Sequence, residues 1–597
     1  MLLKELYDLY ERLCASGENL PRPGMSVQNI SYRIIIRPSG ELVRIEDARE
    51  PEVVIKKSKK GVTEKTEMRM RTMLVLGGTK SSGSGVNPCF LWDNVTYMLG
   101  VAKLDEKQNN KKRIAKCFHT FRKKHLDMEQ EINSPAYSAV CRFLENWNPE
   151  LFPSYNKNPD IFKGFGVFML EGATRCVHED SKVVEWWQAN GEKRWSASEK
   201  KDKEIPQGLC LVTGKMSPIA ALHSPAIKGV IGAPAMGAKL VSFNLSAFAS
   251  YGKEKGLNAP VSEYAAFAYC NALNYLMSRD SRRVRLGDAT VVFWTDAPQK
   301  NTADEMEMLI AGGLDAGRVE AVDSELAEQV SLKLQDIARG KNVLDIEASS
   351  VRFFILGLAP NESRLLVRFY FTGTMGDFVR NLQQHYADLS LQRRGGKFND
   401  SEIITPYMLL LETVRDAKEI PPMLGGALMR SILQNQPYPD AIALAVFRRF
   451  RADRNVNYNR CAFLKAWLSR KSSTYNVRPM LDETNVNPGY VLGRLFSILC
   501  KTQEDAMPNV NRRVRDAFYA SASSSPSSVF PHIIKTYNYH LAKMEGGRRV
   551  NREKLMLSVM GLITAFPAHL NLEQQGLFAL GFYHQTQAFY TSSKQEN

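Results

Sequence analysis

The sequence predicts an α+β fold, in which a mixed sheet-and-helix N-terminal body precedes a helical bundle that makes up the C-terminal third. Two stretches alternate apolar and polar residues as β-hairpins do: residues 30–47, with a turn at Pro38-Ser39-Gly40, and residues 351–374, with a turn at 360–363. From about residue 401 onward, apolar residues recur almost throughout at helical spacing. The chain has 597 residues, 44% of them hydrophobic, which is material for about three or four domain cores.

The elements of the N-terminal body follow from local patterns. Residues 1–20 form an amphipathic helix that carries acidic side chains, which is not the composition of a signal peptide. Residues 52–61 are expected to extend the sheet of the first hairpin. Ser134 and Pro135 are placed as the N-cap and the first-turn residue of a helix. The remaining elements predicted in this part are helices at 113–132 and 181–195 and a strand at 162–170.

The central part alternates helices and strands. Ser262 caps a helix that runs to about Arg279, and residues 289–295 are an apolar strand. Residues 303–340 predict two helices joined at glycines, and another helix begins near Met375 after the second hairpin. We expect four domains: an N-terminal α+β domain, a central α+β domain, a helical connector and a C-terminal helical bundle. Their predicted boundaries are 1–205, 206–400, 401–479 and 480–597.

Composition narrows the class of protein. Lysine and arginine total 79 against 63 acidic residues, a net charge of +16 that suits a polyanionic partner. Nucleic acid is favoured, with acidic membrane surfaces and acidic proteins as the alternatives. Nine cysteines without a C-x-x-C pair argue against a disulfide scaffold and fit a reducing compartment. No apolar run is long enough to span a bilayer, so a cytoplasmic location is expected.

The glycine-rich loop Gly77–Asn87 follows an apolar run and resembles a phosphate-binding loop. Its spacing is wrong for a Walker motif, because Thr79 separates Gly78 from Lys80. Glycines also let the backbone approach a nucleic-acid groove, where slender polar side chains can contact base edges. An ordinary surface loop is the alternative. The candidate base-contacting residues are Lys80, Ser82 and Asn87.

Signs of catalysis are weak. Cys176 with His178, and Cys210 with His223, lack the second close pair of ligands that zinc requires. Asp160 and Asp296 are isolated carboxylates, and a lone one at a strand end is usually a turn cap. We therefore predict no catalytic residue, no metal and no cofactor. A metal-dependent nuclease with an unrecognised carboxylate site around Asp296 or Asp160 is the alternative, and a basic scaffold that only bridges proteins is a third possibility.

Basic clusters occur along the whole chain. One such cluster is most often a solvated face, but several spread over every domain indicate a long groove that follows a nucleic-acid backbone. The residues predicted to contact that backbone are Lys111, Lys112, Arg113, Arg122, Lys123, Lys124, Lys253, Asn258, Arg282, Arg283, Arg285, Arg448, Arg451, Arg512, Arg513, Arg548 and Arg549. Around Lys253 and Asn258, Tyr251, Gly252 and Pro260 could equally hold a structural turn.

Several segments together resemble one family. They are residues 87–101 (NPCFLWDNVTYMLGV), 210–230, 240–276, 289–297 and 487–506 (NPGYVLGRLFSILCKTQEDA). In these blocks the chain resembles the large subunit of the type I-C CRISPR surveillance complex, Cascade, from the first helix to the tail. In "FLWDN", Phe90 and Trp92 are expected in the core, with Asp93 and Asn94 as caps.

The resemblance implies a non-catalytic protein that works in an RNA-guided antiviral complex. Its N-terminal domain would recognise the protospacer-adjacent motif in target double-stranded DNA, promote duplex opening and hold the displaced single strand in the R-loop. Implied partners are the guide CRISPR RNA, the other Cascade backbone and RNA-handle-capping subunits, and a helicase-nuclease recruited to cut. The C-terminal region resembles a small subunit that can also be translated separately, and Met480 stands where such a product would start.

Overall fold

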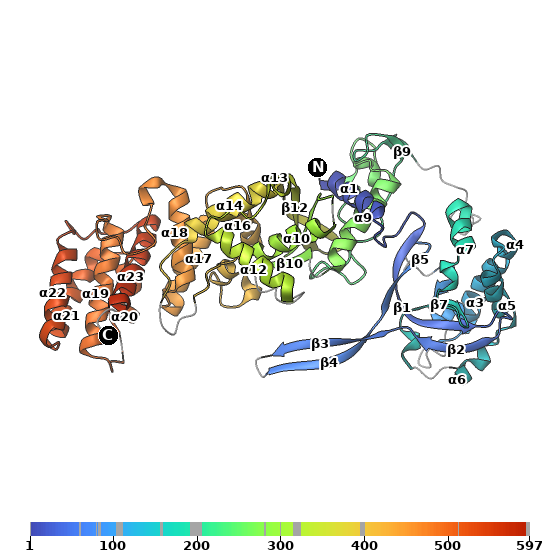
Figure 1. The fold of residues 1–597 in the computed structure, drawn as a ribbon, viewed down its shortest axis with the longest axis horizontal. Helices are drawn as coiled ribbons and strands as arrows, with labels where there is room; N and C mark the ends of the chain where they lie inside the picture. The colour runs from blue at the N-terminus through green and yellow to red at the C-terminus, as the bar shows by residue number, and fades with distance from the viewer. Residues whose placement is uncertain are drawn as a thin grey trace. The chain divides into compact units, whose positions relative to one another are not determined.

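The chain forms two compact units in a computed structural model (Figure 1). One unit comprises Leu3–Pro225 and Phe243–Ala272, and the other comprises Ala226–Ser242 and Leu273–Asn597. The predicted α+β class is confirmed: the sheets lie in the N-terminal and central parts, and the end of the chain is helical. The structure describes residues 2–58, 61–78, 80, 85–102, 111–155, 159–191, 206–279, 282–298, 300–314, 324–394, 400–511 and 513–592.

A five-stranded sheet organises the first unit. Strand β1 (Met25–Ile36) is central and pairs antiparallel with β2 (Leu42–Asp47) and β5 (Arg71–Leu76). It pairs parallel with β7 (Phe165–Leu170), and β7 continues to the two-residue strand β6 (Trp92–Asp93). The β1–β2 hairpin confirms the turn predicted from the sequence.

One prediction about this sheet is wrong. Strand β3 (Glu50–Ser58) does not extend it but pairs with β4 (Gly61–Arg69) in a separate two-stranded ribbon, drawn as two adjacent arrows in Figure 1. It is β5 that joins the sheet, along the N-terminal half of β1 from Met25 to Ile30. Residues 52–61 alone do not indicate that they pair with the strand that follows them in the sequence.

Helices cover the sheet of the first unit. They are α3 (Lys111–Leu126), α4 (Glu129–Ile132), α5 (Pro135–Asn146) and α7 (Ser181–Trp186). The Ser134 hydroxyl accepts the Tyr137 N–H at 3.3 Å at the start of α5, which confirms the predicted cap. Phe121 and Phe143 from these helices pack with Phe168 of β7 in a buried core.

The remainder of the first unit joins the two ends of its sequence. Helix α1 (Leu2–Ala15) packs against α9 (Glu263–Ser278), where the Tyr10 ring meets the Phe267 ring edge-on at 6.1 Å between centroids. The Ser262 hydroxyl accepts the Ala265 N–H, as a cap does. A short hairpin, β8 (Gln207–Leu209) with β9 (Met216–Pro218), precedes this helix.

The second unit begins with an antiparallel four-stranded sheet. Its strands are β10 (Arg283–Leu286), β11 (Ala289–Thr295), β12 (Arg352–Asn361) and β13 (Arg364–Thr374), in that order. The predicted hairpin and the predicted apolar strand are both present. Between β11 and β12 the chain forms helices α10 (Lys300–Leu314) and α12 (Ser324–Ala338). Helix α14 (Met375–Leu389) follows β13 and is capped by Thr374.

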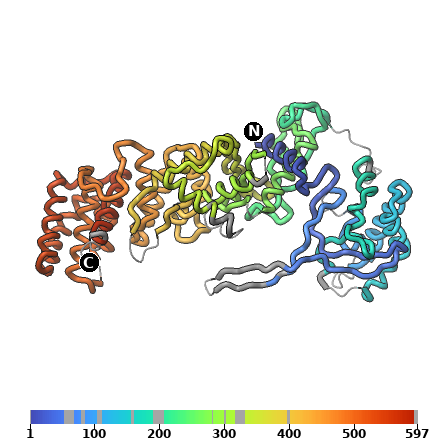
Figure 2. The backbone as a smooth tube through the Cα atoms, viewed as in Figure 1, coloured from blue at the N-terminus to red at the C-terminus, as the bar shows by residue number. Residues whose placement is uncertain are grey.

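In the described residues from 400 to 592, the regular structure is helical, and Figure 2 traces it as a tube. The helices are α15 (Pro406–Leu411), α16 (Pro422–Leu433), α17 (Asp440–Asp453), α18 (Tyr458–Lys471), α19 (Pro488–Ala506), α20 (Val514–Ala522), α21 (Pro526–Ala542), α22 (Gly546–Met560) and α23 (Leu572–Ser592). Helices α19 and α23 approach closely because Gly493 lies against the α23 backbone, where an added Cβ would stand 2.1 Å from the Phe578 carbonyl oxygen. A continuous apolar core runs from the sheet of this unit to α23.

Candidate nucleic-acid interface

The glycine-rich loop leaves the sheet at the end of β5. Gly77 has a φ of +96° and donates its N–H to the Gly24 carbonyl oxygen at 2.7 Å, which turns the chain away from β1. The loop rejoins described structure before Phe90 and Trp92, which are 1% and 0% exposed and confirm the predicted core positions. The loop is therefore held at both ends by the core of the first unit.

Lys80 is part of this anchoring. Its ammonium group forms an ion pair with the Asp93 carboxylate and donates to the Asn87 carbonyl oxygen at 2.7 Å. It also lies 3.6 Å from the centre of the Tyr97 ring, and its side chain is only 17% exposed. In this conformation the Lys80 ammonium group is paired with groups of the protein itself.

Asp93 is the other half of the anchor. Its carboxylate is fully buried and accepts the N–H groups of Cys89 at 2.9 Å and Asn94 at 2.8 Å. Burial raises the pKa of the Asp93 carboxyl, and Lys80 opposes that rise. Asn94 caps α2 (Val95–Met98) by accepting the Thr96 N–H, as predicted, whereas Asp93 closes the loop instead of capping a helix.

The other two candidate base-contacting residues differ from Lys80. Asn87 is exposed, and its backbone N–H donates to the Tyr97 hydroxyl at 3.2 Å, which fixes the backbone that carries the side chain. Ser82 lies outside the described residues. Asn87 is thus the candidate that combines a supported backbone with an exposed position.

The first basic cluster lies on α3. Cys117, Phe118 and Phe121 face the core, which leaves the basic residues on the other faces of the helix. Lys111, Lys112, Arg113 and Lys123 are exposed, while Arg122 and Lys124 are half-buried. Burial lowers the pKa of the Lys124 ammonium group.

The second basic cluster, Arg282, Arg283 and Arg285, contains both buried and exposed side chains. Arg282 is 5% exposed, and its guanidinium pairs with Asp304 at 3.0 Å and with Glu307 at 2.5 Å. Arg283 is half-buried and donates to the Met277 carbonyl oxygen at 3.0 Å, whereas Arg285 is exposed. The sequence does not distinguish the three arginines, whereas the fold buries Arg282, half-buries Arg283 and exposes Arg285.

The two nominated residues in the turn of Lys253 and Asn258 also differ in their surroundings. Asn258 uses its side-chain amide within the chain: Oδ1 accepts the Ser250 N–H at 3.0 Å, and Nδ2 donates to the carbonyl oxygens of Lys253 and Lys255 at 3.0 and 3.1 Å. Lys253 is exposed. Tyr251, which the sequence offered as a possible structural residue, is 98% exposed and supports no core.

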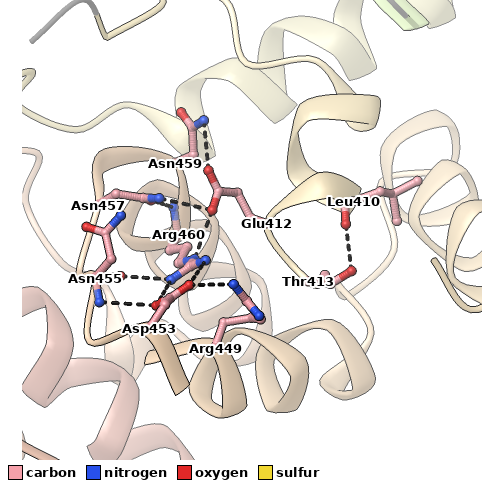
Figure 3. Close-up of polar contacts among 9 residues, drawn as sticks. All are labelled: Leu410, Glu412, Thr413, Arg449, Asp453, Asn455, Asn457, Asn459 and Arg460. Atoms are coloured by element: carbon pink, nitrogen blue, oxygen red, sulfur yellow. Dashed lines mark hydrogen bonds and ion pairs between the residues drawn. The ribbon is translucent and has the colours of Figure 1, made fainter. Parts of the chain in front are cut away.

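Where helices α17 and α18 meet, two arginines form ion pairs with carboxylates of the chain (Figure 3). Arg460 of α18 is 4% exposed and is held between Glu412 and Asp453, each at 2.8 Å. Arg449 of α17 pairs with the same Asp453 at 2.7 Å. The nominated residues Arg448 and Arg451 lie on the exposed side of α17. Internal ion pairs therefore hold the helices together, and other arginines remain on the surface.

The last clusters lie in the C-terminal helices. Arg548 and Arg549 are exposed in the first turn of α22, where the unpaired N–H groups and the helix dipole already place positive charge. Cations at that end do not stabilise a helix, so their position is not explained by folding. Arg513 is exposed at the start of α20, and Arg512 lies outside the described residues.

The residues considered for catalysis have structural surroundings. Asp296 accepts the backbone N–H of Arg352 and pairs with its guanidinium, both at 2.8 Å, and the side chain of Asp160 is not among those described. His223 Nδ1 lies 2.6 Å from the Tyr269 hydroxyl, and the Cys210 sulfur accepts the Ser262 N–H. Nowhere in the described part of the chain do three or more His, Cys, Asp or Glu side chains gather as a metal site would require. Within the same ranges, every helix is too short or too polar to span a bilayer.

Comparison with known proteins adds one finding. The family model described as CRISPR-associated protein (Cas_Csd1) matches residues 6–590, nearly the whole chain. No curated protein matches the sequence. The family match covers both compact units, the anchored glycine loop and the C-terminal helices.

Proposed function

The chain belongs to the Cas_Csd1 family of CRISPR-associated proteins, and from that premise we propose that it is a Cascade subunit that recognises the protospacer-adjacent motif in target double-stranded DNA. In this proposal it promotes opening of the duplex, stabilises the R-loop and helps to recruit a helicase-nuclease. Base pairing with the guide RNA would select the target, while this subunit would contact a few flanking base pairs and the phosphate backbone. The single observation that carries the proposal is the family match along residues 6–590.

The surface charges support a nucleic-acid partner. Both compact units expose basic side chains, and the second unit also uses Arg282 and Arg460 in internal ion pairs. Because each phosphate neutralised on duplex DNA releases counterions, binding should weaken steeply with salt. The exposed residues proposed to contact phosphates are Lys111, Lys112, Arg113, Lys123, Lys253, Arg285, Arg448, Arg451, Arg513, Arg548 and Arg549.

Asn87 is proposed as the residue that contacts a flanking base pair. It is exposed at the rejoining end of the glycine loop, and its backbone is held by Tyr97 and by Lys80. A side-chain amide can donate to and accept from a base edge, so it can distinguish one pair from another. Lys80 then acts by positioning Asn87, through its bond to the Asn87 carbonyl oxygen.

The test measures duplex binding by the assembled complex for every flanking triplet, with native chain, Asn87→Ala and Gln434→Ala. Gln434 is an exposed amide in the second unit and serves as the matched control. We expect the native complex to prefer a small set of triplets, and Asn87→Ala to lose about 1–3 kcal/mol at one flanking position only. A native complex without any preference would refute motif recognition, and an Asn87→Ala variant that binds all triplets more weakly by one factor would refute the role of Asn87.

We also propose that the chain does not itself cleave nucleic acid. Asp296, the carboxylate that raised the nuclease alternative, is neutralised by Arg352. Incubation of the purified chain with DNA and Mg²⁺ or Mn²⁺ should leave the DNA intact. Cleavage that EDTA abolishes would contradict this part of the proposal.

A separate C-terminal product beginning at Met480 is proposed from the resemblance. Met480 is 61% exposed and lies between α18 and α19, outside both helices. In the full chain Trp467 and Leu468 of α18 pack over Gly576 of α23, so a separate product would uncover this apolar contact and could use it for docking. Expression of the native gene should yield a second band that Met480→Leu removes, and a full-length band alone would argue against the product.

A further inference from the structure

Tyr251 stands on the surface in an unusual way. It is 98% exposed, the most exposed aromatic side chain among the described residues, and its φ is +52°. Bulky residues seldom adopt that backbone conformation, which favours glycine and asparagine. Neither burial nor backbone preference therefore accounts for tyrosine at this position.

The turn around Tyr251 is rigidly built. The Lys253 N–H donates to the Ser250 carbonyl oxygen at 2.9 Å, and both central residues, Tyr251 and Gly252, have positive φ, as in a type I′ turn. The Asn258 amide group ties Ser250, Lys253 and Lys255 together with three hydrogen bonds. A tight turn of this kind presents its first central side chain at the tip.

The base of the turn is fixed to the rest of the first unit. Gly256 donates its N–H to the Ala221 carbonyl oxygen at 3.1 Å, and an added Cβ would stand 1.9 Å from the Ala220 carbonyl oxygen. Only glycine permits this approach. Tyr251 is consequently held away from the surface by a preorganised support, so contact with a partner would cost little ordering of the chain.

Charge indicates the partner. Lys253 and Lys255 are exposed on either side of Glu254, within four residues of Tyr251. An exposed aromatic ring with neighbouring cations is the combination by which proteins bind single-stranded nucleic acid: the ring stacks on a base and the cations contact phosphates. A base inside a duplex has both faces covered by its neighbours, so stacking of this kind requires an unpaired base.

We propose that Tyr251 stacks on an unpaired base of single-stranded nucleic acid while Lys253 and Lys255 contact the adjoining phosphates. The inference deepens the proposed function and rests on it, since an opened duplex supplies such a strand. Asn258 and Gly256 are positioning residues in this arrangement and need no contact with the strand.

The test measures binding of a fluorescein-labelled oligothymidylate to the full-length chain by fluorescence anisotropy. Tyr251→Ala and Tyr251→Gly should weaken binding about five- to tenfold, near the lower end expected for one stacked base, and Tyr251→Phe should stay close to native. Tyr251→Gly should melt at or above the native temperature, because glycine suits the positive φ. Ile346→Ala is the matched control, since it removes a side chain that is 93% exposed and not aromatic.

A second arm replaces the bases of the oligonucleotide by abasic sites. The native chain should lose affinity for the base-free strand, and Tyr251→Ala should lose much less, because the stack is already absent. Lys253→Ala with Lys255→Ala should reduce the salt dependence by about 1.4 in log–log slope on single strands. These three readouts separate stacking from general charge attraction.

Several outcomes would overturn the inference. Equal losses on the base-free strand for native and Tyr251→Ala would exclude stacking, and a Tyr251→Phe variant as weak as Tyr251→Ala would assign the effect to the hydroxyl. Unchanged oligothymidylate binding with failed assembly into the complex would make Tyr251 a protein contact. The flanking-triplet preference of the complex is measured separately, so its absence would refute the proposed function whatever Tyr251 does.

Discussion

Replacement of Lys80 by alanine is expected to disrupt the anchoring of the glycine loop. The Lys80 side chain is 17% exposed, and the Asp93 carboxylate that it pairs with is fully buried. Removing the lysine would leave a buried negative charge that, among the described residues, has the Cys89 and Asn94 N–H groups as partners. Loss of one partner of a buried pair costs about 3–5 kcal/mol.

That cost is local, so a local assay is required. Hydrogen exchange of the peptide that contains Cys89 and Asn94 reports on opening of the loop. At about 1.36 kcal/mol per tenfold change, Lys80→Ala should accelerate exchange there about 100-fold or more. Lys80→Ala with Asp93→Asn should recover much of the protection, because the buried charge is absent from the double variant.

The pH dependence has a definite sign. The pKa of Asp93 is raised by burial, and loss of Lys80 raises it further. A folded state that holds the proton more tightly than the unfolded chain becomes less stable as pH rises between the unfolded value of 3.8 and the raised pKa. The deficit of Lys80→Ala relative to native should therefore shrink as pH falls towards 4.

Two results would refute this reasoning. Native exchange in Lys80→Ala, combined with loss of flanking-triplet preference, would show that Lys80 is a free base-contacting residue. A double variant that exchanges as fast as Lys80→Ala would show that the buried charge is not the cause.

Two further predictions concern the C-terminal helices. Gly493→Ala should lower the urea concentration at which α19 and α23 separate, at a cost of about 3 kcal/mol, because backbone atoms of α23 cannot move aside. Gly547→Ala is the control, since a Cβ there meets nothing within 4 Å. A native-like urea transition in Gly493→Ala would contradict the close packing of the two helices. Arg548→Ala with Arg549→Ala should lower the salt slope of duplex binding by about 1.8 without loss of thermal stability, and an unchanged slope in the assembled complex would remove both from the interface.

Local patterns in the sequence were sufficient for much of the fold. The two hairpins, the caps at Ser134 and Ser262 and the helical end of the chain are determined by residues close together in sequence, and all were predicted. The family was identifiable from blocks of the chain, and the match over residues 6–590 confirms that resemblance. The role of Asp93 was predicted wrongly as a cap, because its partner Lys80 is 13 residues away and separated from it by a loop.

Only the tertiary structure decided which polar residues remain available to a partner. Arg282 and Arg285 look alike in the sequence, but Glu307 and Asp304 of α10 bury the first and leave the second exposed. The sequence suggested Tyr251 as a turn-supporting residue and Asn258 as a nucleic-acid contact. In the structure the Asn258 amide holds the turn and the Tyr251 ring projects from it. Exposure depends on which distant segments cover a residue, and that covering is a property of the packed chain, whereas hairpins and caps depend on neighbours that the sequence already places side by side.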